Sequence, residues 1–287
     1  METKILTPRQ SFAMQNSAIP LKKGGTPPSQ VNDLIDGVII KYDTIDSTSN
    51  LAKTIATGVN SHGTIITANH QTAGRGRFGR SFFSPAGHGI YMSLILHSSK
   101  IQLANPVMAT VFAAVAVCKA IEKVCTHTAK KLQIKWVNDI FYNNKKICGI
   151  LTEPVFDAKT GNIDSIVIGI GINFSTPQDG MPKDIENIAG AIFFDQKPTI
   201  TKEDLINEVA YEIMKICNSN IPPFLDEYKS KVFVIGKKIT VIDAGQRYEA
   251  IALDIDQDAR LVVEKSTGEI IAISSGEVSI VGFRKEE

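Results

Sequence analysis

This sequence has few cysteines and lacks the spacings that metal sites need. None of its four cysteines forms a CxxC pair, and their spacing does not resemble a disulfide framework. The five histidines show no i, i+4 pairing and no link to the cysteines, so these residues are not expected to form a metal site. Both absences are typical of a reduced, intracellular protein.

Membrane-spanning and secretory segments are also missing. The most uniformly apolar run is VFAAVAV at residues 111–117, which is far too short to cross a bilayer. The N-terminus lacks the apolar core of a secretory signal, and residues 1–36 show almost no hydrophobic periodicity, which predicts a disordered tail. A cytoplasmic protein is expected, although the basic residues of the tail also leave an organelle transit peptide open.

The chain has little net charge. Its 287 residues carry a formal charge of +1, with 43% hydrophobic and 21% charged residues, which is ordinary for a globular protein. Nucleic-acid binders usually carry a basic face, so the balance argues against DNA as a partner, and no membrane surface is expected to bind. The length suits one large domain and one small domain.

One local stretch departs from this balance. AGRGRFGRSF, residues 73–82, holds three arginines and three glycines but no acidic residue. It could be a solvated basic loop, an RGG-like nucleic-acid segment, or a loop that closes over an anionic small molecule. Arginine forks suit carboxylates and phosphates, and glycines let a ligand approach the backbone.

Strand patterns dominate the first two thirds of the chain. An Asn-Asn turn within residues 140–153 predicts a hairpin, and Leu132, Ile134 and Trp136 share one face of a strand opposite Lys135. The remaining strand patterns lie at residues 37–46, 63–71, 89–96 and 163–173. Because GIGIN does not match GxGxxG and no Walker A motif occurs, an α+β fold with a largely antiparallel sheet is expected instead of a Rossmann repeat.

Three helices are expected between these strands. Ser47 can cap a helix that stops at Gly58, and Asn105 with Pro106 starts a largely buried helix that runs to about residue 124. Thr201 and Asp204 approximate a capping box before an amphipathic helix, and PPFLDEY suggests one further short helical piece.

The pattern of predicted secondary structure changes near Gly236. Short strand patterns then follow one another closely, separated by turns such as DQD and STGE, as in a small β-barrel. The predicted division is a tail at 1–36, a catalytic domain at 37–233 and a C-terminal barrel at 234–287.

Five short motifs follow one another along the chain: DSTSN, HQTAGRGRFGR, KWVND, KKICGILTE and GIGIN. In this order they resemble the biotin protein ligases over about residues 38–283. Two departures are Val137, where the family usually has proline, and Ser49, where many relatives have asparagine. The resemblance implies a catalytic domain similar to class II aminoacyl-tRNA synthetases, followed by an SH3-like barrel. Some bacterial relatives carry an N-terminal helix-turn-helix, and residues 1–36 are too short and irregular for one, so a monofunctional enzyme is expected.

The resemblance also implies an activity. Such enzymes join biotin to ATP with Mg²⁺, giving biotinyl-5'-AMP and pyrophosphate, and pass biotin to one lysine of a biotin carboxyl carrier domain of a carboxylase. A homodimer is among the assemblies this family would allow. Two other functions stay open: a lipoate–protein ligase or octanoyltransferase, and a non-enzymatic biotin-sensing or nucleic-acid-binding regulator.

Site residues follow from matching the motifs. Because both substrates are anions, cations are needed at the reacting centre. The expected catalytic residues are Lys146, Arg77 and Asp139. The expected biotin-binding residues are Ser47, Thr48, Ser49, Gln71, Gly74, Arg75, Arg77, Lys146, Gly149, Leu151 and Gly169, with Gly171 as a further wall. The expected ATP-binding residues are Arg75, Arg77, Arg80, Phe82, Lys135, Asn138 and Asn173.

Each assignment has a plainer alternative. Lys135 could be a solvent-facing strand lysine, Lys146 a turn lysine and Ser47 only a helix cap. Trp136 is expected in the core, because its neighbours alternate between faces.

Overall fold

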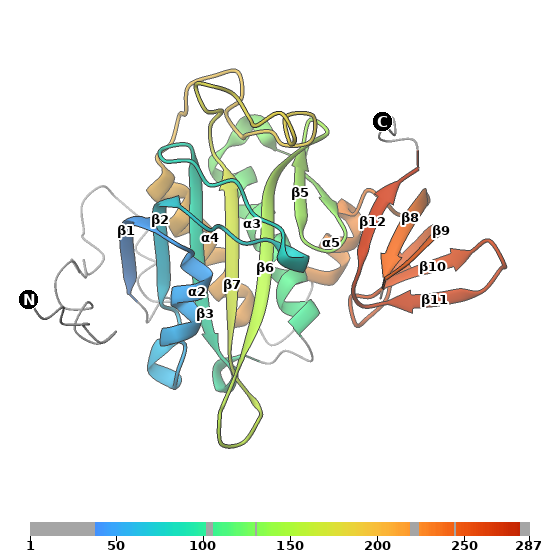
Figure 1. The fold of residues 1–287 in the computed structure, drawn as a ribbon, viewed down its shortest axis with the longest axis horizontal. Helices are drawn as coiled ribbons and strands as arrows, with labels where there is room; N and C mark the ends of the chain where they lie inside the picture. The colour runs from blue at the N-terminus through green and yellow to red at the C-terminus, as the bar shows by residue number, and fades with distance from the viewer. Residues whose placement is uncertain (1–37, 102–105, 130, 219–223, 244, 282–287) are drawn as a thin grey trace, which may run out of the picture.

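The computed structural model describes residues 38–101, 106–129, 131–218, 224–243 and 245–281. Two sheets dominate it, a large one crossed by the main helices and a smaller one at the C-terminal end (Figure 1). The predicted tail at 1–36 and the helix cap predicted at Asn105 lie outside the described residues.

The large sheet has seven strands in the order β1-β2-β3-β7-β6-β5-β4. Its β1 and β2 run parallel, whereas its other neighbouring strands are antiparallel, which confirms the predicted α+β class. Side chains of one face therefore alternate with those of the other along every strand. The strands are β1 Ile39–Ile45, β2 Ile65–Gln71, β3 Gly89–His97, β4 Gln133–Lys135, β5 Asp139–Tyr142, β6 Lys145–Phe156 and β7 Ile163–Asn173.

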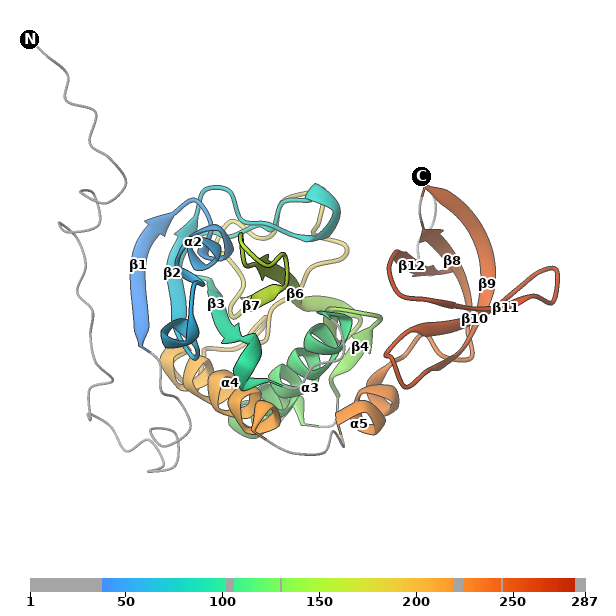
Figure 2. The same cartoon turned by 90° about the horizontal axis from the view of Figure 1, so that it is seen from below.

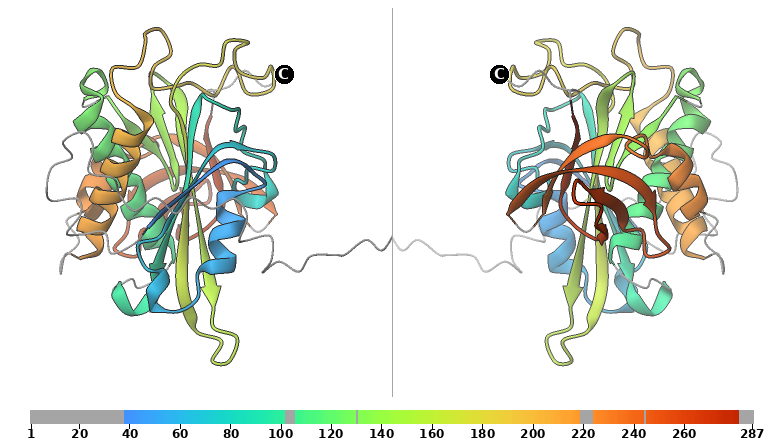
Figure 3. Two further views of the ribbon diagram at one scale, coloured as in Figure 1. Left: turned by 90° about the vertical axis from the view of Figure 1, so that its left-hand side faces the viewer. Right: turned by 90° about the vertical axis from the view of Figure 1, so that its right-hand side faces the viewer.

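Helices lie on both faces of this sheet. The helices α3 (Pro106–Val124) and α4 (Lys202–Cys217) cover one face, while α2 (Thr48–Ile55) lies on the other (Figures 2 and 3). Residues Ala109 to Cys118 of α3 are all buried, as expected for a helix that is apolar all round. Within the described residues, no helix is long and apolar enough to span a bilayer.

Local sequence signals account for several boundaries. Thr201 and Asp204 form the expected capping box at the start of α4. The helix predicted to stop at Gly58 ends earlier, at Ile55, because Ala56 already leaves the helical conformation. Asn143 and Asn144 both have positive φ, 49° and 60°, so they form the tight turn that joins β5 to β6.

The second sheet is antiparallel, in the order β11-β10-β9-β8-β12. Short helix α5 (Phe224–Lys231) leads into it (Figure 1). Its five strands match the predicted C-terminal patterns, with β11 and β12 at the edges; closure into a barrel stays a prediction. The strands are β8 Lys238–Asp243, β9 Gln246–Ile255, β10 Leu261–Lys265, β11 Ile270–Ile273 and β12 Glu277–Ile280.

One hydrophobic core joins the two sheets. Trp136, in the turn that joins β4 to β5 of the large sheet, belongs to the same buried cluster as Leu261 and Val278 of the small sheet. The indole Nε1 of Trp136 donates to the carbonyl of Ala259 at 3.2 Å. Trp136 is therefore a core residue, as predicted, and it also fixes one sheet against the other.

Candidate active site

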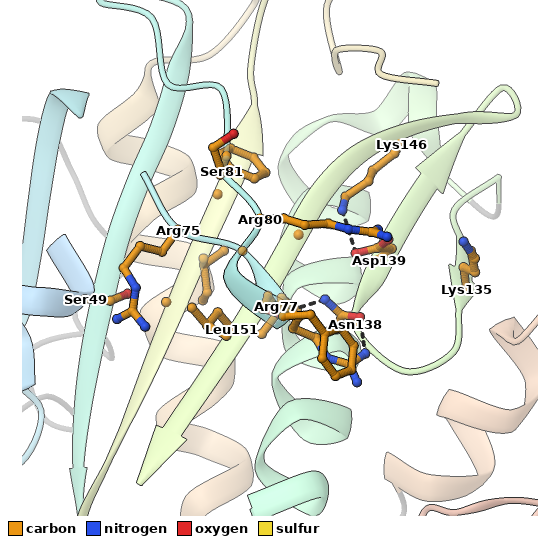
Figure 4. Close-up of a pocket in the computed structure, with 18 of the residues that line it drawn as sticks. Ser49, Arg75, Arg77, Arg80, Ser81, Lys135, Asn138, Asp139, Lys146 and Leu151 are labelled. Carbon is orange, nitrogen blue, oxygen red and sulfur yellow. Dashed lines mark hydrogen bonds and ion pairs between the residues drawn. The ribbon is translucent and has the colours of Figure 1, made fainter. Parts of the chain in front are cut away.

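A pocket lies between the large sheet and the arginine-rich loop at residues 72–82 (Figure 4), and residues 276–278 also line it. Strands β6 and β7 contribute part of its wall, and the start of α2 contributes hydroxyl groups. Of the residues predicted from the motifs, these line it: Ser47, Thr48, Ser49, Gln71, Arg75, Arg77, Arg80, Phe82, Lys135, Asn138, Asp139, Lys146, Gly149, Leu151, Gly169 and Gly171.

Hydroxyl and amide groups gather at the α2 end of the pocket. Ser47 caps α2, since its side chain accepts from the backbone N–H of Asn50 at 3.4 Å. Gln71 Oε1 accepts from the N–H of Thr48 at 2.9 Å and from its hydroxyl at 3.2 Å. Capping and pocket lining thus coexist at Ser47, which is almost fully buried. Such groups suit a ring that carries both donors and acceptors.

Glycines leave room for neighbouring side chains. A Cβ on Gly169 would approach Ser49 Oγ to 2.4 Å, and one on Gly171 would approach the Phe82 ring to 2.5 Å. Gly149 is looser, with Lys146 and Phe82 atoms at 3.3 Å. At Gly169 and Gly171 of the GIGIN motif the space that a Cβ would fill is thus taken by side chains of this chain, which lie in the wall of the pocket.

Lys146 and Asp139 form an ion pair within the pocket. Lys146 Nζ lies 2.7 Å from Asp139 Oδ1 (Figure 4). The contact is an ion pair whose angles do not suit a hydrogen bond. The β5–β6 hairpin places the two residues, because the Asn143–Asn144 turn sets the register of its strands. The ammonium has three donors, so it can hold Asp139 and a substrate oxygen together.

Asn138 holds Arg77 over the pocket. Arg77 donates to Asn138 Oδ1 at 3.0 Å, while Asn138 Nδ2 donates to the carbonyl of Ile150 at 2.9 Å (Figure 4). Burial lowers the pKa of Arg77, because desolvation disfavours the charged form, while the charges of Asp139 and Glu277 oppose this effect. An arginine stays protonated at neutral pH even so, and its charge is less screened than a surface charge.

The other two arginines of the loop have acidic partners. Arg75 makes two contacts with Glu153, at 3.0 and 3.1 Å, and also donates to Asn50. Arg80 pairs with Glu277 at 2.6 Å, and Arg77 also donates to the carbonyl of Gly276 at 3.2 Å. The charge that looks uncompensated in the sequence is thus compensated by residues distant in the chain, and the loop rests on the C-terminal sheet.

The tip of the loop has an unusual backbone. Phe78 has φ 55° and ψ 35°, a left-handed conformation that a bulky residue rarely adopts, and its ring is exposed beneath the Arg77 guanidinium. The Trp136–Val137 peptide bond, in the neighbouring KWVND motif, is cis.

Two predicted residues do not line the pocket. Gly74 lies under the loop, where a Cβ would approach both Phe82 O and Ser84 Oγ to 2.5 Å. Asn173 donates to the carbonyls of Lys146 and Gly190, so it braces the strand that carries Lys146. Their roles as biotin and adenylate contacts stay predictions.

Several pocket residues lie outside the five motifs. Gly276, Glu277 and Val278 of the C-terminal sheet line the pocket, as does Met92 of β3. No local pattern marks them, because their role depends on contacts across the chain. The described residues include no group of three His, Cys, Asp or Glu side chains that could hold a metal ion.

Comparison with known proteins agrees with this architecture. The model of the Biotin/lipoate A/B protein ligase family matches residues 42–173, and that of the Biotin protein ligase C terminal domain matches residues 234–281. The Bifunctional ligase/repressor BirA of Bacillus spizizenii is 33% identical over 80% of this chain and 70% of its own length. The biotin–acetyl-CoA-carboxylase ligase of Mycobacterium tuberculosis is 26% identical over 80% of this chain and 84% of its own.

Solved structures share the fold. The biotin protein ligase of Aquifex aeolicus in complex with biotin and ATP superposes with a TM-score of 0.68 at 24% identity, covering 84% of this chain and 97% of that one. The biotin protein ligase of Leishmania major in complex with biotin gives a TM-score of 0.55 at 25% identity, covering 83% of this chain and 98% of that one.

The fold and the cationic pocket define a ligase of the biotin and lipoate class. The matched C-terminal domain and the likeness to these relatives over 80% of this chain narrow the class to the biotin ligases. The chain belongs to the biotin protein ligase family, whose members activate biotin with ATP and transfer it to protein, and it is an enzyme of this kind.

Proposed function

We propose that the two ends of the pocket divide the recognition of biotin. The hydroxyl and amide groups of Ser47, Thr48 and Gln71 hold the bicyclic ring, and Arg77 with Lys146 holds the carboxylate. The observation that carries this proposal is that one pocket joins a hydroxyl-lined end to a cationic end. Biotin has the matching layout, with a polar ring at one end and a carboxylate at the other.

In the first half-reaction, a carboxylate oxygen of biotin attacks the α-phosphorus of ATP. The new P–O bond forms as the bond to the bridging oxygen breaks, and pyrophosphate leaves. Arg77 and Lys146 offset the repulsion between the two anions and stabilise charge on the α-phosphate. Arg80, Lys135 and Asn138 line the same pocket and are the proposed contacts for the rest of ATP.

Mg²⁺ fits this site as a companion of ATP. It usually binds through one or two carboxylates together with substrate phosphates, not in an all-protein cage. Two carboxylates, Asp139 and Glu277, line the pocket, and each already pairs with a cation. We assign the ion mainly to the phosphates, whose charge it would neutralise, and Asp139, the partner of Lys146, is the carboxylate that would help to hold it.

In the second half-reaction, the neutral amine of an acceptor lysine attacks the mixed anhydride and displaces AMP. With a pKa of about 10.4, only roughly one lysine in 2,500 is neutral at pH 7. Asp139 already pairs with the Lys146 ammonium, so its proposed role is to attract and orient the incoming ammonium of the acceptor in the same way. The proposed acceptor is a biotin carboxyl carrier domain of a biotin-dependent carboxylase.

Mass spectrometry of the adenylate tests the substrate. The protein is incubated with ATP, Mg²⁺ and either biotin, lipoate or octanoate, and each reaction is quenched and weighed. Biotinyl-AMP alone is expected, whereas a lipoyl or octanoyl adenylate of equal yield would contradict the proposal. Adding a carrier domain, with its target lysine replaced by arginine as the control, tests the acceptor.

A further inference from the structure

A chain of buried hydroxyl groups lies behind the hydroxyl-lined end of the pocket. Ser93 of β3 is fully buried and sits between two pocket residues: its Oγ is 2.8 Å from Thr48 Oγ1 and 3.1 Å from Ser49 Oγ. Thr48 in turn contacts Gln71, whose Nε2 donates to Ser84 Oγ at 3.0 Å. Ser93 itself does not line the pocket, and nothing in the motifs marks it.

The amide of Gln71 fixes the direction of this chain. The backbone N–H of Thr48 can only donate, so the atom of Gln71 that faces it at 2.9 Å must be the oxygen. The same oxygen lies 3.2 Å from Thr48 Oγ1, which must therefore donate its single proton to it.

The remaining donors follow by elimination. The Thr48 hydroxyl already donates its only proton to Gln71. In the 2.8 Å contact between Ser93 Oγ and Thr48 Oγ1, Ser93 must therefore be the donor. Ser93 thereby donates its only proton to Thr48. In the 3.1 Å contact between Ser49 Oγ and Ser93 Oγ, Ser49 must therefore be the donor. The protons point one way, from Ser49 through Ser93 and Thr48 to Gln71.

This direction determines what the pocket offers to a ligand. Thr48 and Ser49 have committed their protons and can present only acceptor lone pairs. Ser47 is the opposite case: its oxygen accepts from the N–H of Asn50, so its proton is available to donate. Two acceptors beside one donor complement a cyclic urea, which has two N–H groups and one carbonyl, and they offer no match to a dithiolane ring or an alkyl chain.

We infer that Ser93 is a positioning residue that sets the hydrogen-bond polarity of the ring-binding end, so that the pocket selects a cyclic urea over other acyl substrates. The inference rests on the proposed placement of the biotin ring near Ser47, Thr48 and Gln71. Ser93 acts through Thr48 and Ser49, without touching the substrate.

Replacing Ser93→Ala tests it. Ser49 then keeps a proton with no acceptor behind it, which can turn towards the pocket and oppose a ureido N–H. We expect the KM for biotin to rise about tenfold, with kcat at saturating biotin and the KM for ATP unchanged. KM does not depend on the fraction of folded enzyme, so a partly unfolded preparation does not hide the result. Ser165→Ala is the matched control, since Ser165 is a fully buried strand serine that bonds to Asp164.

A double variant separates polarity from packing. Adding Ser49→Ala to Ser93→Ala removes the misdirected proton, so part of the lost affinity for biotin should return. If Ser93 served only packing, Ser49→Ala should instead lower the affinity for biotin further. Additive losses, or an unchanged KM in Ser93→Ala, would overturn the inference.

Thr48→Val distinguishes this inference from the function on which it depends. If Thr48→Val leaves the KM for biotin unchanged, the ring does not bind at this end and both proposals fail. If Thr48→Val raises the KM while Ser93→Ala does not, the ring placement stands and only the role of Ser93 is rejected.

Discussion

Lys145 and Lys146 are adjacent on β6, yet they have different partners. Lys146 pairs with Asp139 in the pocket, whereas Lys145 donates to the carbonyl of Glu186 outside it. Neighbouring residues of a strand point to opposite faces, so this pair offers a matched comparison of one cation inside the site with one outside.

Lys146→Ala should slow adenylate formation about a hundredfold, equivalent to about 3 kcal/mol of transition-state stabilisation, because the reacting oxygens lose a charge-assisted contact. Pyrophosphate release measures the rate, and Lys145→Ala should stay close to the unchanged enzyme. Equal rates of adenylate formation in the two variants would show that Lys146 does not contribute to this step.

The buried thiols predict a response to alkaline pH. All four cysteines are free, and burial raises the pKa of Cys125 to about 12 because desolvation disfavours the thiolate. In the unfolded chain the thiol ionises near its ordinary value of about 8.5, so above that pH the unfolded state binds fewer protons and stability falls as pH rises.

Cys125→Ala should therefore reduce the alkaline loss of stability. Between pH 9 and 12 each such thiol lowers the free energy of unfolding by about 1.4 kcal/mol per pH unit, and below pH 8 it contributes nothing. Urea unfolding at pH 8 and pH 10 measures how the free energy of unfolding changes with pH. Any loss of stability from the substitution that does not depend on pH cancels in this difference. An identical slope in both proteins would show that Cys125 does not carry this linkage.

At the scale of elements, local patterns were informative and distant contacts were not. The hairpin, the capping box and the C-terminal strands follow from turn residues and alternation that a short window contains. The motif cations also converge on one pocket, as expected. The sequence does not indicate the partners of the arginine loop, because Glu153 and Glu277 reach it only through the fold. Nor does it indicate Ser93, since the proposed role of Ser93 depends on its contact with Thr48 from another element.

The arginine loop depends on the C-terminal sheet for its position. Arg80 is well exposed, so its pair with Glu277 should contribute only about 0.2–1 kcal/mol. Glu277→Gln should leave the stability of the whole protein nearly unchanged but increase the open fraction of the loop by up to about fivefold.

Tryptic cleavage after the loop arginines reports this opening. The cleavage rate should rise in Glu277→Gln and stay unchanged in Glu269→Gln, because Glu269 of the same sheet pairs with Lys265 and does not reach the loop. Equal cleavage of both variants would mean that Glu277 does not hold the loop.

At the scale of the molecule, the shared core predicts a single unfolding unit. Leu261 of β10 is fully buried in the cluster that also contains Trp136. Leu261→Ala should cost about 2–5 kcal/mol and lower the melting temperature of one common transition. Trp136 is the single tryptophan and contacts Ala259, so its fluorescence reports the junction of the two sheets while calorimetry reports the whole protein. Two separate transitions would show that the C-terminal sheet folds independently.

The place of residues 276–278 in the pocket also bears on protein synthesis. A ribosome delivers Ser47 early and Gly276 late, so the pocket cannot be complete until residue 278 has left the exit tunnel. A nascent chain that already displays the arginine loop and Lys146 still lacks the surface on which the loop rests. Assembly of the complete pocket therefore follows synthesis of the C-terminal sheet.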